Sequence, residues 1–212
     1  MHLAVLGGTF DPPHNGHLAL CLYARELLEI EKIIISVSNN PFKHSRGATD
    51  QQRKCMAEHL SSEINRTGTS SQVSGWELEK RQPSYTVDLL KYIRQLYPHD
   101  RVTLLVGEDS FREFHLWKDY KQLFSLCDIV VFRRTASEVS APLQNSLQQN
   151  GSIVVIDFAC EVSSTEIREL VASGKSVSRL LPPSVNRYII ENNLYRNTPL
   201  TTLTPEQKRR ES

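Results

Sequence analysis

The chain alternates between short apolar runs and longer segments with helical periodicity, and this alternation most strongly constrains its fold. The short runs are rich in β-branched residues, which is typical of buried strands; they are residues 3–6, 33–37, 102–106, 129–132 and 153–156. The helical candidates are residues 16–28, 50–64, 86–96, 120–125, 165–172 and 183–191. Strands that alternate with helices form parallel sheets with helices on both faces. The pattern therefore predicts an α/β fold, a doubly wound parallel sheet flanked by helices.

Size and charge limit the domain organisation and the partners. With 212 residues and 39% hydrophobic content, the chain can bury one large core, and we expect residues 1–196 to form a single domain. Residues 197–212 contain few apolar side chains, and we expect them to form a flexible tail. A formal net charge of +1 gives no general attraction to nucleic acid or to a membrane surface, so we expect neither as a partner.

The cysteines and the apolar runs bear on the compartment. Cys21, Cys55, Cys127 and Cys160 are far apart and show neither the close pairs of a zinc site nor a dense disulfide framework. We expect buried free thiols and no metal site built by the protein. Nothing resembles a signal peptide, and no apolar run approaches the roughly 20 residues that cross a bilayer. The sequence therefore predicts a cytoplasmic protein.

Glycines and histidines follow the first predicted strand. Gly7 and Gly8 can adopt backbone conformations closed to other residues, which predicts a sharp turn and a close approach to a phosphate. His14 and His17 are three residues apart, so a helix beginning near Asn15 would present both imidazoles on one face of its first turn. Unpaired backbone N–H groups there favour anions. For two histidines alone, the alternative is a strand-to-helix corner with solvent-facing rings.

The eleven-residue context of these histidines, GGTFDPPHNGH at residues 7–17, resembles the first signature of the nucleotidylyltransferase superfamily. That signature is His-x-Gly-His after the first strand. The glycine-rich flank is similar to the form found in bacterial nicotinate mononucleotide adenylyltransferases. The resemblance implies a Rossmann-like nucleotidylyltransferase fold and catalytic roles for the two histidines. It also implies ATP binding by four preceding residues, which are Gly7, Gly8, Thr9 and Phe10.

A second hydroxyl-rich segment, SSTEIR at residues 163–168, follows the last predicted strand. Ser163 and Glu166 have capping-box spacing, so helix capping explains them without any ligand. Hydroxyls and N–H groups at a helix start, with an arginine in its first turns, also suit a phosphate, and both roles can coexist. The segment is similar to the superfamily's second signature, Ile-Ser-Ser-Thr-x-x-Arg, with Val162 in place of the isoleucine. This resemblance implies that Ser163, Ser164 and Arg168 contact the ATP phosphates, with Arg168 in a catalytic role.

Two further cations follow the second predicted strand. Lys43 lies in Pro41-Phe42-Lys43, which is similar to a Pro-x-Lys element of the family. The resemblance implies that Lys43 is catalytic, and a surface-loop lysine is the alternative. Arg53 is similar to the arginine of a family Arg-x-x-Met pattern, although exposed helical arginines are ordinary.

Residues 83–89, PSYTVDL, begin another predicted helix, which Ser84 or Thr86 can cap. The segment resembles the family's Ser-Tyr-Thr-x-Asp-Thr-Leu pattern, but it lacks the second threonine. The resemblance implies that Ser84, Tyr85 and Thr86 bind the nicotinate part of the mononucleotide. A structural reading, in which the segment only starts a helix, stays open.

Three further candidates, Gly107, Asp109 and Trp117, follow the third predicted strand, residues 102–106. A carboxylate at the end of a strand can accept hydrogen bonds from ribose hydroxyls in doubly wound nucleotide sites. The family pattern Gly-x-Asp followed by a tryptophan implies nucleotide contact for Gly107 and Asp109 and stacking of Trp117 on the pyridine ring. The alternative for Trp117 is a core aromatic residue.

The resemblance spans residues 1–195 and implies a reaction. ATP and nicotinic acid mononucleotide would give nicotinic acid adenine dinucleotide and pyrophosphate by direct in-line attack, as a step of NAD biosynthesis. Mg²⁺ would be bound mainly through the ATP phosphates. The alternatives are an adenylyltransferase for nicotinamide mononucleotide or another phosphate acceptor, and a nucleotide-sensing module without turnover. Residues 83–89 argue against phosphopantetheine as the acceptor.

Overall fold

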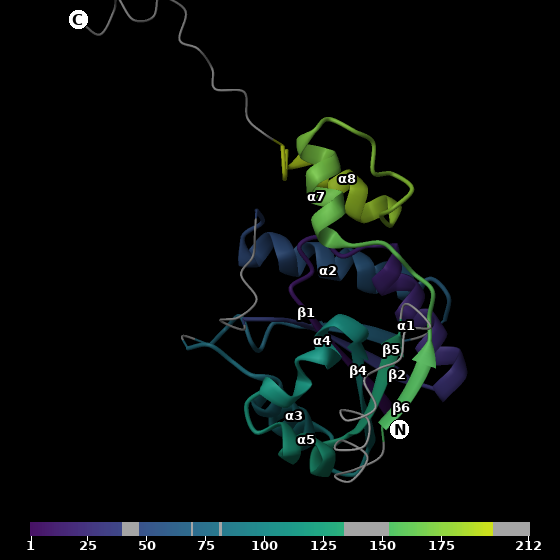
Figure 1. The fold of residues 1–212 in the computed structure, drawn as a ribbon, viewed down its shortest axis with the longest axis vertical. Coiled ribbons are helices and arrows are strands. Elements are labelled where there is room, and N and C mark those ends of the chain that lie inside the picture. Colours follow the sequence, from purple (N-terminus) through teal and green to yellow (C-terminus); the bar gives the residue numbers. More distant parts are fainter. Residues whose placement is uncertain (40–46, 69, 81, 134–152, 197–212) are drawn as a thin grey trace, which may run out of the picture.

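A computed structural model of the chain describes residues 1–39, 47–68, 70–80, 82–133 and 153–196. In these ranges, neighbouring strands pair in parallel and form one sheet in the order β3-β2-β1-β4-β5-β6 (Figure 1). The strands are β1 (His2–Gly8), β2 (Lys32–Val37), β3 (Ser70–Ser74), β4 (Arg101–Gly107), β5 (Asp128–Arg133) and β6 (Ile153–Asp157). The helices are α1 (Asn15–Leu28), α2 (Asp50–Asn65), α3 (Thr86–Leu96), α4 (Glu108–Arg112), the 3₁₀ helix η1 (Phe114–Leu116), α5 (Tyr120–Leu126), α7 (Ser164–Ala172) and α8 (Pro183–Glu191). The predicted doubly wound α/β fold is confirmed.

Side chains along β1 alternate between the two faces of the sheet. Leu3 and Val5 pack with α3, α4 and α5, whereas Ala4 and Leu6 pack with α1 and α2. Figure 1 shows α2 and α3 on opposite sides of the sheet. Because both faces are covered, the central strands are apolar throughout and read as continuous runs in the sequence. This is why the predicted strands agree with the observed ones to within two residues at each end.

The strand β3 and the two short helices α4 and η1 were not predicted. β3 has the sequence SSQVS and pairs with β2 at the edge of the sheet. Its Val73 packs against the core on the α1 and α2 side, and the strand contains no other apolar residue. Polar edge strands and helices of one turn leave no periodic apolar signal.

A third apolar cluster attaches the C-terminal helices to α2. It contains Met56 of α2, Ile167 of α7, and Val185 and Ile189 of α8, all buried. In Figure 1, α7 and α8 lie beyond α2, on its far side from the sheet. The predicted tail, residues 197–212, lies outside the described residues.

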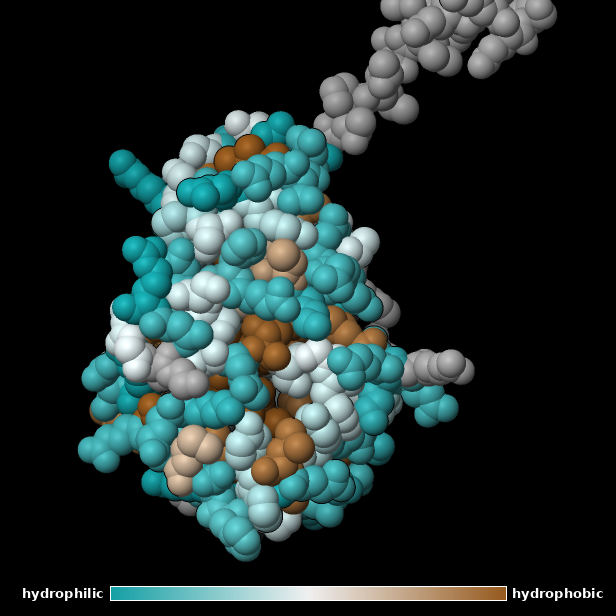
Figure 2. Space-filling view, turned by 180° about the vertical axis from the view of Figure 1, so that it is seen from behind, coloured by the Kyte–Doolittle hydropathy of each residue, from teal (hydrophilic) through white to brown (hydrophobic). Residues whose placement is uncertain are grey.

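The surface of the rear face is mostly hydrophilic, with hydrophobic side chains gathered around a central hollow (Figure 2). In the described part of the chain, no helix combines the length and the apolar character that spanning a membrane requires.

All four cysteines are free, but only Cys21 and Cys127 are buried, and burial raises the pKa of each of these thiols to about 12. The prediction of buried thiols was therefore wrong for Cys55 and Cys160, which are partly exposed.

Candidate active site

A cavity of about 500 Å³ opens at the carboxyl ends of β1 and β4. These two strands are neighbours at the centre of the sheet, and β2 and β5 flank them on opposite sides. The strand order reverses between β1 and β4, and ligands of doubly wound sheets bind at such a reversal. The cavity volume lies in the range of small-molecule sites. The cavity is therefore the candidate ligand site.

Both signature histidines line this cavity, and they cap α1 in an unusual way. His14 is the N-cap, and its Nδ1 accepts a hydrogen bond from the Gly16 backbone N–H at 3.1 Å. The His17 Nδ1 accepts from the His14 backbone N–H at 3.2 Å, which completes a capping box usually built from serine and glutamate. Since each Nδ1 is an acceptor, the ring hydrogen of each neutral imidazole is on Nε2. The ring centroids are 3.9 Å apart, so the two imidazoles lie side by side as their spacing predicts, with His14 at the N-cap and His17 in the first turn.

The sharp turn predicted at Gly7 and Gly8 is not found at these residues. Both residues belong to β1, and the described glycines with positive φ are Gly68 and Gly174. The left-handed residue of the loop is Phe10, with φ of 50°. Its ring lies 3.1 Å from where a Cβ on Gly8 would be, and a Cβ on Gly7 would enter open space. The glycines are thus needed for room beside Phe10 and in the cavity, which Gly7 lines.

The second signature reaches the same cavity. Ser164 Oγ donates a hydrogen bond to the Pro12 carbonyl at 2.8 Å, and Arg168 Nη1 donates to the Asp11 carbonyl at 2.7 Å. Ser164 and Arg168 line the cavity together with His14. Segments about 150 positions apart in the sequence are therefore joined by direct contacts with the loop before α1.

On the other side of the sheet, Thr86 begins α3 and Trp117 follows η1, and both line the cavity. The N-cap of α3 is Tyr85, which makes no side-chain capping bond, so the predicted capping by Ser84 or Thr86 was wrong. The Lys118 Nζ lies 4.7 Å from the centroid of the Tyr85 ring.

Gly107 and Asp109 bring the end of β4 into the site. Gly107 is the last residue of β4 and the N-cap of α4, and Asp109 lies in the first turn of that helix. Both residues line the cavity. Their position at the carboxyl edge of the sheet agrees with the prediction.

Some predicted site residues are not part of the cavity wall. Phe10 is buried behind His17, with ring centroids 5.2 Å apart. Ser163 caps α7 by accepting from the Glu166 N–H, whereas Ser84 is buried and Tyr85 lies beneath Lys118. Lys43 lies outside the described residues.

Glu77 is one of the wall residues that the sequence did not indicate. Glu77 is buried, with 4% of its surface exposed, and it lines the cavity. Its Oε1 accepts a hydrogen bond from Ser36 at 2.7 Å, and its Oε2 accepts from Ser84 at 2.8 Å. Because Ser36 is 41 positions away, on β2, no local pattern marks this carboxylate.

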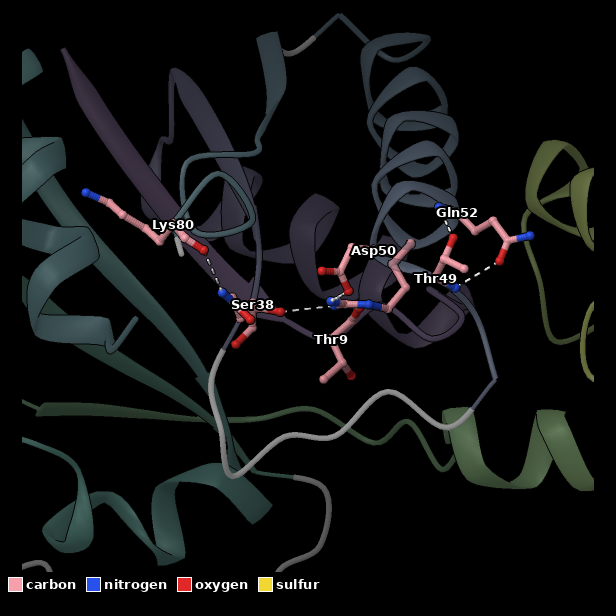
Figure 3. A network of polar contacts seen from close by, with 8 residues as sticks. Thr9, Ser38, Thr49, Asp50, Gln52 and Lys80 are labelled. Atoms are coloured by element: carbon pink, nitrogen blue, oxygen red, sulfur yellow. Dashed lines mark hydrogen bonds and ion pairs between the residues drawn. The ribbon is translucent and has the colours of Figure 1, made fainter. Parts of the chain in front are cut away.

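Arg53, which the sequence indicated only weakly, supports two residues of the cavity wall, Thr9 and Ser38. Its Nη1 donates to the carbonyl oxygens of Thr9 at 2.8 Å and Ser38 at 3.1 Å, and its Nη2 pairs with Asp50 at 2.8 Å (Figure 3). Only 4% of the side chain is exposed, so Arg53 differs from the exposed helical arginine that the sequence allowed. Arg53 therefore fixes the ends of β1 and β2 relative to α2.

Comparison with known proteins agrees with this architecture. Residues 5–170 match the family model described as cytidylyltransferase-like. The chain belongs to this family.

Its relatives include named adenylyltransferases. A protein of Pelodictyon phaeoclathratiforme named "probable nicotinate-nucleotide adenylyltransferase" is 59% identical, over 100% of both chains. A protein of Chlorobium phaeobacteroides with the same name is 55% identical, over 93% of this chain and 100% of its own. A solved structure of Plasmodium falciparum nicotinic acid mononucleotide adenylyltransferase complexed with NaAD has the same fold, with a TM-score of 0.72 and 20% identity over 92% of this chain and 97% of that one. The resemblance inferred from the signatures is confirmed.

Proposed function

We propose that this chain transfers the adenylyl group of ATP to nicotinic acid mononucleotide, giving nicotinic acid adenine dinucleotide and pyrophosphate in NAD biosynthesis. One observation carries the proposal: a single cavity has two walls with different chemistry. The phosphate wall consists of His14, His17, Ser164 and Arg168, and the pyridine wall consists of Glu77, Thr86 and Trp117. The names of two similar relatives support the same reaction.

The reaction is a direct phosphoryl-type displacement. A phosphate oxygen of the mononucleotide bonds to the α-phosphorus of ATP, the bond from that phosphorus to the bridging oxygen breaks, and pyrophosphate leaves with the electron pair. No covalent nucleophile is needed, so the protein contributes positioning and charge stabilisation. His14 and His17 donate Nε2–H hydrogen bonds to phosphate oxygens as negative charge develops.

The rest of the phosphate wall holds the leaving group. Arg168 and Ser164 stand at the start of α7, where backbone N–H groups also favour anions. Gly7, Gly8 and Thr9 leave room for the triphosphate, and Lys43 adds a further cation. Phe10 and Ser163 act from behind, by packing against His17 and by capping α7.

The pyridine wall receives the mononucleotide. Trp117 stacks on the pyridine ring, and Thr86 with the backbone N–H groups at the start of α3 binds the nicotinate carboxylate. Gly107 and Asp109 contact ribose hydroxyls. Ser84 and Tyr85 support Thr86 without forming part of the wall themselves.

Mg²⁺ would be held mainly by the phosphates of ATP. Among the described residues, no group of three or more His, Cys, Asp or Glu side chains is placed to hold a metal ion. Mg²⁺ keeps several waters and binds readily through substrate phosphates, so the phosphates of ATP suffice. It lowers the charge repulsion between the two phosphate-bearing substrates. We place the reaction in the cytoplasm, where free thiols such as those of this chain persist.

The test is pyrophosphate release from ATP and Mg²⁺, with each acceptor supplied separately. We expect rapid release with nicotinic acid mononucleotide, slower release with nicotinamide mononucleotide and none with phosphopantetheine. EDTA should stop the release, and added Mg²⁺ should restore it. A preference for the amide would reassign the acceptor, and binding of ATP without release for any acceptor would identify a nucleotide-sensing module.

A further inference from the structure

Glu77 bonds to two separate elements of the fold. On one side it accepts from Ser36, which is fully buried in the second strand from the edge of the sheet. On the other side it accepts from Ser84, two residues before α3 begins at Thr86. The carboxylate therefore connects the sheet to the start of a helix that forms part of the pyridine wall.

This connection matters because α3 lacks an ordinary cap. Tyr85 is its N-cap residue and makes no side-chain capping bond. A buried carboxylate is stable only when its oxygens accept hydrogen bonds, and here each oxygen has a serine hydroxyl as donor. The pairing constrains Ser84 strongly, since breaking it leaves a buried charged oxygen without its donor.

We propose that Glu77 is a positioning residue for mononucleotide binding. Through Ser84 it fixes Thr86 and the backbone N–H groups at the start of α3, where the nicotinate carboxylate binds. The inference rests on the proposed function, and it makes Ser84 the link between Glu77 and the start of α3, without contact with the ligand.

The test measures kcat and the KM for each of the two substrates in Glu77→Ala and Ser84→Ala. We expect each variant to raise the KM for nicotinic acid mononucleotide about 10-fold, the factor expected from one hydrogen bond to a charged group. The KM for ATP and the kcat at saturation should change less than about 2-fold, because the phosphate wall is untouched. The double variant should also show about a 10-fold effect and not the product of two, since both changes remove the same pair.

A conservative variant and matched controls separate positioning from loss of stability. Glu77→Gln should recover part of the affinity, because the amide can still pair with both hydroxyls. Ser61→Ala removes another buried hydroxyl pair, with Ser71 at 2.7 Å, and it should lower Tm without changing either KM. Glu79→Ala removes an exposed carboxylate two residues after Glu77 and should change neither Tm nor the KM for either substrate.

The outcomes distinguish this inference from the proposed function. Wild-type protein that releases no pyrophosphate with nicotinic acid mononucleotide overturns both. If the wild type is active, a KM unchanged or lowered in Ser84→Ala, or a loss confined to kcat, overturns the positioning role alone. If Glu77→Ala does not fold, Ser84→Ala and Glu77→Gln still decide the question, because they delete one hydroxyl or one charge and keep the packing.

Discussion

The phosphate wall and the pyridine wall of the cavity are held in place by different means. His14 and His17 are fixed by bonds with backbone groups at most three positions away. On the pyridine wall, Glu77 depends on a strand hydroxyl 41 positions away, and Trp117 follows a one-turn helix. The histidine pair is therefore held by local bonds, whereas Ser164 and Arg168 of the same wall join it through the carbonyl oxygens of Pro12 and Asp11. The second wall is only as well placed as the tertiary contacts that support it.

If the phosphate wall performs the chemistry, the largest effect will come from removing one of its donors. His17→Ala should lower kcat about 100-fold or more, which is the usual effect of losing one donor to transition-state charge. Steady-state pyrophosphate release measures the rate, and circular dichroism should show the fold unchanged. His99→Ala, at an exposed site, is the control. Turnover close to that of the wild type would exclude His17 from the phosphate wall.

A second change tests the rigidity of this wall and leaves both imidazoles present. A Cβ on Gly16 would lie 2.9 Å from His14 Nδ1 and 3.1 Å from Cys160 Sγ. The His14 ring must then move, so Gly16→Ala should lower kcat by a factor on the order of 30, since small misplacements of reacting groups are costly. Gly16→Ala combined with Cys160→Ala should stay impaired. Recovery in the double variant would show that the cysteine contact, and not displacement of His14, is responsible.

A substitution in the pyridine wall should lower the affinity for nicotinic acid mononucleotide and not the rate of the reaction. Trp117→Ala should raise the Kd for nicotinic acid mononucleotide about 10-fold, the effect of losing one aromatic stacking partner. The affinity for ATP should stay the same, and Trp117→Phe should keep most of the binding. Titration calorimetry with each substrate measures both values. An unchanged Kd for the mononucleotide would remove Trp117 from the pocket.

The sequence predicted the histidine pair of the phosphate wall because the geometry of that pair is local. The spacing of His14 and His17 is enough to place both rings on the first turn of α1, and a capping pattern is enough to start α7 at Ser164. The central strands were equally readable, since burial on both faces makes them apolar throughout. Local patterns therefore predicted the central strands of the sheet, the histidine pair and the start of α7.

What the sequence could not show depends on contacts between distant segments. Glu77 lies in no periodic pattern, and its function as an acceptor appears only when Ser36 and Ser84 are brought to it. Ser84 looked like a helix cap because serine is a common N-cap, but a buried carboxylate is a stronger acceptor for its hydroxyl. The backbone at Gly7 was misjudged for a similar reason, since the space that it leaves belongs to the cavity and not to a turn.

The smallest effect on activity is expected where the C-terminal segment supports the phosphate wall from outside. Tyr195 donates a hydrogen bond to Asp11 Oδ1 at 2.6 Å, and burial, together with this bond, raises the pKa of its hydroxyl above the ordinary value of 10. Tyr195→Phe should lower the free energy of unfolding by about 2 kcal/mol, or Tm by roughly 4–8 °C, with kcat changed less than about 3-fold.

The pH dependence of this stabilisation follows from the direction of the pKa shift. A raised pKa in the folded state means that the contribution of Tyr195 is complete below about pH 10 and is lost as the pH rises through the folded-state pKa. The stability difference between wild type and Tyr195→Phe should therefore be constant from neutral pH to about pH 10 and shrink above it. Urea unfolding across this range measures the difference. A loss of kcat as large as that of Gly16→Ala would instead make Tyr195 part of the phosphate wall, because Asp11 lines the cavity and its carbonyl oxygen accepts from Arg168.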